Sequence, residues 1–545
     1  MIDLAIIGSG FGGAVMAARL GAALRVLKPS ARVVVMEKGQ DHTGAFDPQS
    51  LGDPLNAQGN RFRHSLSPQY LSTIAQLHTD PAGAFKNGAP SMNVLSGVGL
   101  GGGSNVYDGV SLRAPAEAFE QQRDGRRLWP FIYSRASLEP HYARAAQMLK
   151  VARLQWSDAT VPHWQLATRR DFAFAEGCRR IGATAVPLKV ATFDDANEGW
   201  WNEGQRFEGR QGLSKNYLRD AHVSGVQMWS GCEVESVAPI AGGYVVKGTD
   251  HRTHAKLEEE CRMVIVAGGS VGSTQLLLRS APAFEGAREL DPGALLGRHV
   301  SGNGDYGVTG SVGASYADDV DGFKGKPMSS FCPSFFRQHK FILIPFYAAP
   351  LYLSLGTFST LMRPKNPKAL GRGSTPEAAG ERDWGLPYKQ RLQTFGKRML
   401  TMGCLALDAC EGSISLSPGG NSAVVRWGET ASTTEARWNA AVDTMRRIYE
   451  ALGGELYLDG YRKDGTVHTA HPLGGCRMAE RGAAVNGVVD PFGECLNNPN
   501  LFVIDSAIVP SAIGANPSLT IAAVAESIAD RLVRGDGLRA LKDRV

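Results

Sequence analysis

Near the N-terminus, Gly8-Ser9-Gly10-Phe11-Gly12-Gly13 has the glycine spacing of a loop that binds the pyrophosphate of a dinucleotide. Gly8 would allow the tight turn, and Gly10 would let the backbone approach the phosphates closely. Gly13 would let the following helix pack against the strand, with its first amides aimed at the phosphates. Glu37 is placed to accept hydrogen bonds from a ribose diol. A purely structural turn is the alternative, but Glu37, at the end of the next apolar run, favours a dinucleotide site.

The elements that would position this loop follow from the apolar pattern. Leu4-Ala5-Ile6-Ile7 is a continuous apolar run, as expected for a parallel strand buried on both faces. Residues 14–24 have helix-forming composition, and residues 32–36 form a second apolar run that ends on Glu37. The three segments predict a βαβ unit. This unit alone does not distinguish NAD from FAD.

Two later segments are also rich in glycine. Residues 96–104 are dense in glycine, which lets backbone lie flat against a large planar ligand. A flexible linker is the alternative, although it would be expected to carry more Ser and fewer Val and Leu. The apolar run 262–266 predicts a buried strand, followed by a Gly/Ser turn over 267–273 and a helix over 274–279. This turn is a second place where amides can face a dinucleotide.

Composition limits the class of protein. The chain has 545 residues, which exceeds what one hydrophobic core usually supports, so we expect at least two domains. Its net charge of +5 is small for this length and no block of like charge occurs, so nucleic acid is not an expected partner. The eight cysteines form no CxxC pair, and we expect neither a metal site nor a disulfide framework. A strand starting at Ile2 leaves no room for a signal peptide, which predicts a cytoplasmic protein.

Residues 341–362 form a stretch without charge, flanked by Lys340 and Arg363. Its length would suit a membrane span, but Pro, Gly, Ser and Thr interrupt it. Its aromatic and β-branched content favours buried strands that line an apolar pocket. An interfacial patch that makes weak contact with a membrane surface stays open as the alternative.

The chain then changes character twice. Alternating runs at 307–312, 413–417 and 423–427 predict antiparallel strands, and 434–452 predicts a helix. An apolar strand at 500–505 and a helix at 518–532 return to α/β character. We therefore predict an α/β protein with a discontinuous Rossmann-like domain and a substrate domain built on an antiparallel sheet with helices. The predicted dinucleotide-binding pieces are 1–45, 91–115, 214–305 and 466–545. The predicted substrate domain and covering loops are 46–90, 116–213 and 306–465.

Several motifs coincide in one order along the whole chain. They are Gly99-Leu100-Gly101-Gly102-Gly103-Ser104 with Gly109, the segment 269–277, His471-Pro472-Leu473-Gly474-Gly475-Cys476, and the segments 487–490, 501–506 and 514–518. With them the chain resembles the glucose–methanol–choline (GMC) flavoprotein oxidoreductases, and within that family it is most similar to the cholesterol oxidase group. The region from about 310 to 465 matches poorly.

The resemblance implies FAD rather than NAD. It implies non-covalent binding, because no His or Cys lies in or beside the segment 99–109. Gly8, Gly10, Phe11, Gly12, Gly13 and Glu37 would hold the ADP half. Val234 would contact adenine, and Asp505 would lie near the pyrophosphate and ribityl chain. The remaining cofactor residues would be Gly102, Gly103 and Ser104 beside the isoalloxazine, with Asn516 and Pro517.

The resemblance also implies that His471 and Asn516 face the flavin N5 across the substrate carbinol. A neutral imidazole, with an ordinary pKa near 6.5, can accept the hydroxyl proton near neutral pH. An amide can donate a hydrogen bond to the developing alkoxide. His468, three residues earlier, is expected to be structural.

The implied function is FAD-dependent oxidation of the CH–OH group of a hydrophobic, sterol-like alcohol, with oxygen or another electron acceptor. Residues 322–376 contain no Asp or Glu, so we expect no steroid isomerisation. Tyr107 stands where the family usually has Asn, and its phenol either enters the pocket or fills volume. The alternatives are a dehydrogenase of a sugar, terpenoid or aromatic alcohol using a quinone or carrier, and a non-catalytic flavin-binding protein. We expect a monomer or small homo-oligomer.

Overall fold

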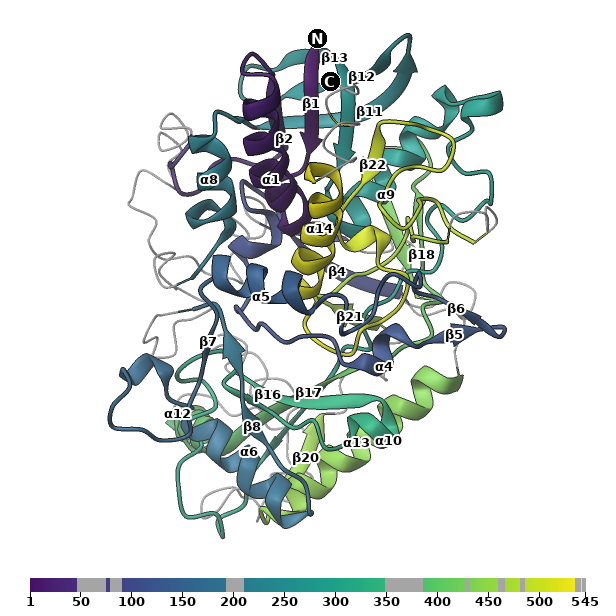
Figure 1. Cartoon of the computed structure of the whole chain (residues 1–545). Coiled ribbons are helices and arrows are strands. Elements are labelled where there is room, and N and C mark those ends of the chain that lie inside the picture. Colours follow the sequence, from purple (N-terminus) through teal and green to yellow (C-terminus); the bar gives the residue numbers. More distant parts are fainter. Residues whose placement is uncertain are drawn as a thin grey trace.

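The computed structural model describes residues 1–46, 75–78, 91–192, 210–347, 386–427, 432–458, 466–480, 486–534 and 541. Helices and strands gather into an upper and a lower part (Figure 1). The upper part contains β1 (Ile2–Ile7) and α1 (Phe11–Leu27) beside α14 (Ser518–Val533), so the two ends of the chain meet there. The lower part contains β16 (Phe341–Phe346), β17 (Met399–Ala406) and α13 (Ser432–Ala451).

A seven-stranded sheet forms the centre of the upper part. Its order is β10-β2-β1-β13-β12-β11, and β22 pairs with β13. The sheet is parallel from β10 to β13 and at β22, whereas β11 and β12 are antiparallel. This topology confirms the predicted Rossmann-like fold, assembled from N-terminal, central and C-terminal segments. The bounds are β2 (Val33–Glu37), β10 (Gln227–Ser230), β11 (Cys232–Ile240), β12 (Gly243–Asp250), β13 (Ala255–Val266) and β22 (Leu501–Val503).

The predicted βαβ unit is confirmed, with one change at the start of its helix. All residues of β1 and β2 are buried, as their apolar runs predict. The helix α1 begins at Phe11, three residues before the predicted start, so it includes the last glycines of the motif. A Cβ on Gly12 would lie 1.8 Å from the carbonyl oxygen of Ile504, so only glycine allows α1 this close to the chain that follows β22.

Two central boundaries differ from the predictions. β13 begins at Ala255, not at residue 262, because its first half alternates exposed and partly buried residues in the hairpin with β12. The apolar run 262–266 marked only the second half of β13, which pairs with β1 and β22. α9 spans Gly269–Ser280, so most of the predicted Gly/Ser turn is its first turn. The carboxylate of Asp505 accepts a hydrogen bond from the Gly269 amide and supports this early start from a distant segment.

The lower part is built on a four-stranded antiparallel sheet in the order β16-β17-β14-β20, as predicted. Its other strands are β14 (Tyr306–Ser311) and β20 (Glu455–Leu458). α13 packs against this sheet and against α6 (Arg169–Arg180). The hydrophobic core between them contains Phe341, Leu400 and Tyr449.

A third sheet joins segments from both predicted domains. β18 (Ser413–Leu416) and β19 (Ala423–Arg426) form the predicted antiparallel pair. However, β19 pairs with β4 (Ser91–Gly97), not with the four-stranded sheet, and β4 also pairs with β3 (Ala75–His78) and β21 (Thr466–Thr469). α9 packs on β18 and β19. This hairpin therefore lies against the upper part of the molecule.

The uncharged stretch is described only in its first part. Phe341–Phe346 is a strand in which five of six residues are buried, which favours the buried-strand interpretation for this part. Residues 348–362 lie outside the described residues. Among the helices that the structure describes, none combines the length and the apolar character needed to cross a membrane.

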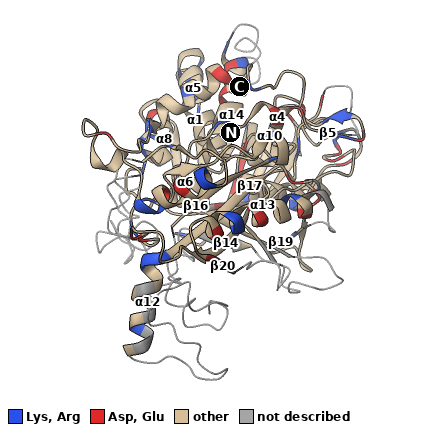
Figure 2. Cartoon of the chain, turned by 90° about the horizontal axis from the view of Figure 1, so that it is seen from below, with Lys and Arg blue, Asp and Glu red and all other residues tan. Residues whose placement is uncertain are grey.

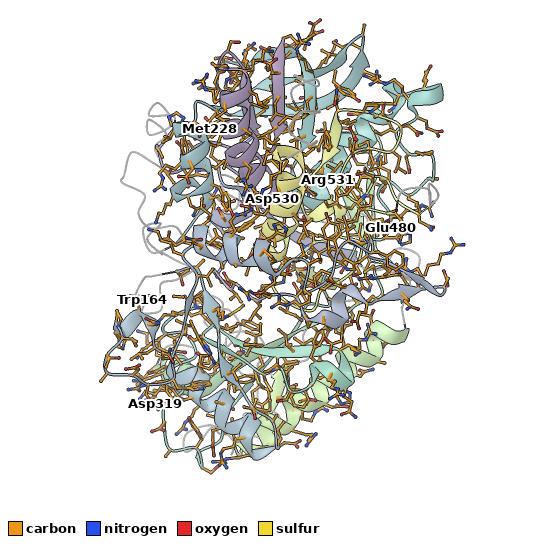
Figure 3. All side chains as sticks on the ribbon, viewed as in Figure 1. Trp164, Met228, Asp319, Glu480, Asp530 and Arg531 are labelled. Carbon is orange, nitrogen blue, oxygen red and sulfur yellow. The ribbon has the colours of Figure 1, made fainter. Side chains whose placement is uncertain are left out.

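An ion-pair network fixes α14, which begins two residues after Asn516. The buried Glu526 of α14 pairs with Arg19 of α1 at 2.7 Å and with Arg144 of α5 (Glu139–Met148) at 3.1 Å. Asp530, labelled in Figure 3, pairs with the same two arginines. Helices from three parts of the sequence are thereby held together beside the site described below.

All eight cysteines lie among the described residues, and they are free and buried. Basic and acidic side chains are interspersed on the face shown in Figure 2. The remaining helices and strands are α4 (Ala116–Phe119), α8 (Tyr217–Val223), α10 (Phe336–His339), α12 (Leu386–Arg398), β5 (Gln122–Arg123), β6 (Arg126–Arg127), β7 (Ala152–Arg153), β8 (Val186–Pro187), β9 (Lys189–Val190) and β15 (Ser330–Phe331).

Candidate active site

A cavity of about 350 Å³ lies where the upper sheet meets the loops from the rest of the chain. Its walls come from the β1–α1 turn, the ends of β2 and β4, the start of α9 and the segment before α14. Most of the predicted site residues line it: Gly8, Gly10, Phe11, Gly12, Glu37, Gly102, Gly103, Val234, His471, Asp505, Asn516 and Pro517. Gly13 and Ser104 are not among its walls.

The β1–α1 turn shows why its glycines are needed. Gly8 has φ +100°, a conformation that strains residues with a side chain. No atom lies within 4 Å of a Cβ built on Gly10, so this glycine leaves open space in the cavity wall. A Cβ on Gly13 would lie 2.1 Å from the Gly8 carbonyl oxygen. Gly13 therefore permits close packing of α1 on the turn, while Gly8 and Gly10 shape the cavity.

The Glu37 carboxylate connects three loops of the cavity wall. Oε2 accepts hydrogen bonds from the Ser9 hydroxyl at 2.7 Å and the Ser9 amide at 3.2 Å. Oε1 accepts from the amides of Gly39 at 3.0 Å and Gly99 at 3.3 Å. Glu37, the residue predicted to bind the ribose, therefore also links the β1–α1 turn, the end of β2 and the second glycine run.

The second glycine run lies directly against the first. Gly99, Gly101 and Gly102 all have positive φ, and a Cβ on Gly102 would lie 2.8 Å from the Cα of Gly10. The run therefore forms part of the cavity wall. This favours the ligand-binding interpretation of the run over the alternative of a flexible linker. The buried Ser104 hydroxyl donates to the Gly101 carbonyl at 2.7 Å and accepts from the Leu213 amide at 2.9 Å, so it fixes the loop from behind.

Asp505 lines the cavity and stabilises the start of α9. Its carboxylate accepts hydrogen bonds from the Gly269 amide and the Ser273 hydroxyl through one oxygen, and from the Ala507 amide through the other. Burial raises its pKa, although these hydrogen bonds favour the charged form. The amides of Gly269 and Ser270 are therefore bonded within the protein, to Asp505 and to the Ser506 hydroxyl, although both residues line the cavity. The prediction that the amides of this turn face a dinucleotide is not confirmed for these two.

Tyr107 lines the cavity, and its hydroxyl is bonded to the protein backbone. Its ring contacts Phe11 edge-on at 5.5 Å between centroids, and its hydroxyl donates to the Gln211 carbonyl at 2.8 Å. The phenol is thus occupied by the protein, which favours the volume-filling alternative. His468 is exposed, and its ring lies 3.4 Å from the Asn93 amide.

His471 and Asn516 lie together, as the sequence predicted, and a third residue joins them. Nε2 of His471 is 3.1 Å from Nδ2 of Asn516. Nδ1 of His471 is 2.9 Å from both carboxylate oxygens of Asp305. A carboxylate only accepts hydrogen bonds, so Nδ1 carries the proton and Nε2 presents its lone pair to the Asn516 amide. Oδ1 of Asn516 is buried and has no hydrogen-bond partner among the described residues.

The charges around His471 favour its protonated form. Burial of the imidazole lowers its pKa, but the nearby carboxylates of Asp305 and Asp108 outweigh burial, and the net pKa of His471 is raised. Asp108 also lines the cavity. A base with this environment holds a proton more strongly than a free imidazole.

Sequence reasoning missed Asp305 and Asp108. Asp305 follows Asn303-Gly304, which is turn composition just before a strand, and it lies 166 positions from His471. The turn composition could have indicated a loop at Asp305, but no nearby residue indicated that His471 would be its partner.

The residues around the cavity fit FAD. The N-terminus of α1 and the glycine-rich backbone before it suit a pyrophosphate, and the acidic Glu37 suits a ribose. The orphaned Oδ1 of Asn516 leaves one acceptor open for a bound group.

Comparison with known proteins identifies the family. Models of the N-terminal and C-terminal GMC oxidoreductase domains match residues 10–290 and 411–525. A cholesterol oxidase of Mycobacterium tuberculosis (strain ATCC 25618 / H37Rv) is 24% identical over 577 residues, which cover 97% of this chain and 90% of the relative. A long-chain-alcohol oxidase of Arabidopsis thaliana is 22% identical over 575 residues, which cover 97% of this chain and 67% of the relative.

Solved structures share the fold. Pyridoxine 4-oxidase from Mesorbium loti superposes with a TM-score of 0.62 at 16% identity, covering 97% of this chain and 98% of that one. A fungal aryl-alcohol oxidase superposes with the same TM-score at 15% identity, covering 98% of each chain. The chain is therefore an enzyme of the GMC oxidoreductase family, flavoproteins that oxidise alcohol groups.

Proposed function

We propose that the chain binds FAD non-covalently and oxidises the CH–OH group of a hydrophobic alcohol. The observation that carries this proposal is the pairing of His471 Nε2 with Asn516 Nδ2 at 3.1 Å, on the wall of the cavity that the glycine loops also line. A base and an amide donor at one point can receive a hydroxyl proton and stabilise the oxygen left behind.

We assign the cofactor residues as the family resemblance implies, and all of them except Gly13 and Ser104 line the cavity. Gly8, Gly10, Phe11, Gly12 and Glu37 would hold the ADP half, with Val234 at the adenine. Gly102 and Gly103 would lie beside the isoalloxazine, Asp505 near the pyrophosphate and ribityl chain, and Asn516 and Pro517 would complete the set. Gly13 and Ser104 act through the loops that they fix.

FAD, when bound, supplies the hydride acceptor at its N5. His471 Nε2 accepts the proton of the substrate hydroxyl, and the Asp305 carboxylate stabilises the imidazolium that results. Asn516 Nδ2 turns its hydrogen bond from Nε2 to the substrate oxygen, so the two side chains separate around the hydroxyl group.

The cavity wall supports a hydrophobic substrate. Val110, Met328 and Ile521 contribute apolar side chains to the cavity that contains His471. The relatives named above include oxidases of cholesterol and of long-chain alcohols. We take a sterol-like or long-chain alcohol as the substrate class, with oxygen as the acceptor. No residue of β16 is among the cavity walls, and this strand carries no carboxylate, so we keep the expectation that no steroid isomerisation follows.

Acid precipitation of the purified protein tests the cofactor, since non-covalent FAD stays in the supernatant. An alcohol panel then tests the reaction: a long-chain primary alcohol, a sterol, benzyl alcohol and a sugar, each with oxygen and with a quinone. We expect a carbonyl product and oxygen consumption with a hydrophobic member. Flavin release without a carbonyl product from any alcohol would favour the non-catalytic flavin-binding alternative.

A further inference from the structure

One tight turn, Ser301–Asp305, contacts the segments that carry both His471 and Asn516. We call it the 301–305 turn. Asn303 and Gly304 have φ +58° and +62° within it. The buried Asp408 carboxylate holds the turn, because one of its oxygens accepts from the Ser301 hydroxyl at 2.8 Å and the Gly304 amide at 3.0 Å.

Toward His471, the turn fixes both backbone and side chain. Ser301 and Leu473 exchange backbone hydrogen bonds at 2.8 and 3.0 Å. The Thr469 hydroxyl lies 3.0 Å from the Gly302 carbonyl and 2.8 Å from Asp305, while it also accepts from the His471 amide at 2.8 Å. Asp305 then reaches Nδ1 of the imidazole with both oxygens. The turn therefore holds the backbone beside His471 and the Nδ1 edge of its ring.

Toward Asn516, the turn uses a single buried side chain. Asn303 Nδ2 donates to the Ala515 carbonyl at 2.8 Å. Its Oδ1 accepts from the amides of Ile513 at 2.9 Å and Gly514 at 3.0 Å. Three hydrogen bonds from one fully buried residue fix the loop that presents Asn516.

We propose that the 301–305 turn sets the relative position of His471 and Asn516, and that Asp305 is a positioning residue that keeps the proton of His471 on Nδ1. With the proton on Nδ1, the lone pair of Nε2 faces Asn516 and the substrate. Without the carboxylate, the proton is free to occupy Nε2, and the ring then cannot act as a base there. The predicted effect on the rate of flavin reduction rests on the proposed function, whereas the predicted tautomer of His471 does not.

Two acidic groups act on the imidazole, and they act differently. Asp305 makes a direct hydrogen bond, whereas Asp108, on the loop after Ser104, contributes through its charge. Both raise the pKa of His471 against the effect of burial. Removing Asp305 should therefore lower that pKa and change the tautomer, whereas removing Asp108 should lower the pKa and leave the proton on Nδ1.

The test uses FAD-loaded protein labelled with ¹⁵N-histidine, with the signals of residue 471 assigned by their loss in His471→Ala. The variants are Asp305→Asn, which keeps the shape, Asp305→Glu, which keeps the carboxylate, and Asp108→Asn. Asp319→Asn is the matched control, because it makes the same chemical change in the lower part of the molecule (Figure 3), where Asp319 pairs with Lys397. The ¹⁵N shifts give the tautomer and pH titration gives the pKa; anaerobic mixing with an alcohol gives the rate of flavin reduction.

We expect the wild type, Asp108→Asn and Asp319→Asn to carry the proton on Nδ1. In Asp305→Asn the proton should move to Nε2, the titration midpoint should fall, and flavin reduction should slow at least about a hundredfold, with partial recovery in Asp305→Glu. A wild-type tautomer and midpoint in Asp305→Asn would overturn the proposal. So would a wild-type protein with its proton on Nε2, whatever the variants do. If no alcohol reduces the wild-type flavin, the proposed function fails, and the ¹⁵N shifts still decide this inference.

Discussion

His471 Nε2 and Asn516 Nδ2 lie 3.1 Å apart, although 45 positions separate them in the chain. The structure brings them together by two routes. His471 lies in the segment after β21, which pairs with β4. Asn516 lies two residues before the start of α14, which the ion pairs of Glu526 hold. Their separation is therefore a property of several packed elements, and a change at either residue tests the site without removing its scaffold.

Replacement of His471 by Ala should slow anaerobic flavin reduction at least about a hundredfold, because the base that accepts the hydroxyl proton is lost. Stopped-flow absorbance of the bound flavin measures this rate. His468→Ala is the matched control, since His468 is exposed three residues earlier, and it should keep the wild-type rate. Near-wild-type reduction in His471→Ala would remove its assignment as the base.

Replacement of Asn516 by Ala should also cost about a hundredfold in the same rate, while FAD stays bound. The reason is the loss of a hydrogen-bond donor to the substrate oxygen, which typically costs about 10²–10³ in rate. The rate is measured with the flavin content held equal to that of the wild type. Loss of FAD with an unchanged rate per bound flavin would indicate a cofactor role alone.

The pH dependence of flavin reduction should report the raised pKa of His471. The base must be neutral to accept a proton, so the limiting rate should rise with pH through a midpoint above the ordinary value of about 6.5. The same pKa affects stability, because it is higher in the folded state than in the unfolded state. Protonation of His471 therefore stabilises the fold fully below about pH 6.5, and this contribution is lost as the pH rises through the folded-state pKa. A midpoint below about 6.5 would contradict the assignment.

Glu37→Ala should weaken FAD binding and lower the stability of the cofactor-free protein. The substitution leaves the donors of Ser9, Gly39 and Gly99 without their acceptor, and each buried donor left unsatisfied costs about 1–3 kcal/mol. Flavin occupancy after dialysis and thermal unfolding measure the two effects. Glu258→Ala, which removes an exposed carboxylate from β13, should change neither. Full occupancy in Glu37→Ala would refute the ribose role.

Cholesterol, if it is oxidised, should yield the ketone without migration of its double bond. Residues 322–376 contain no Asp or Glu, so this region offers no carboxylate to move the allylic proton. Chromatography of the products after a single turnover, before any slow chemical isomerisation, checks this outcome. An enzyme-dependent 4-ene product would show that a carboxylate elsewhere, such as Asp108, performs the step.

The parts of the fold set by near neighbours could be predicted from the sequence. The β1–α1–β2 unit follows from an apolar run, a glycine turn and a second run within forty residues, and only the start and end of its helix differ from the prediction. The first half of β13 could not be predicted, because its charged, half-exposed residues carry no apolar run. The early start of α9 depends on Asp505, more than two hundred positions away.

The site divides in the same way. The glycines and His471 stand in motifs, so the sequence indicated them, whereas Asp305 stands in an ordinary turn and acquires its role only through the fold. Likewise, the bonds from Glu37 to Gly99 and from Ser104 to Leu213 join distant segments, so their structural roles had no local signal.

Anaerobic mixing of the FAD-loaded enzyme with a hydrophobic alcohol is the most direct test of the central claim, that His471 and Asn516 act on a carbinol beside the flavin. The absorbance of oxidised flavin should disappear in the wild type, return when air is admitted, and remain during the same interval in the His471→Ala and Asn516→Ala double variant. Equal loss of absorbance in the double variant, or no loss in the wild type with any alcohol of the panel, would contradict the account.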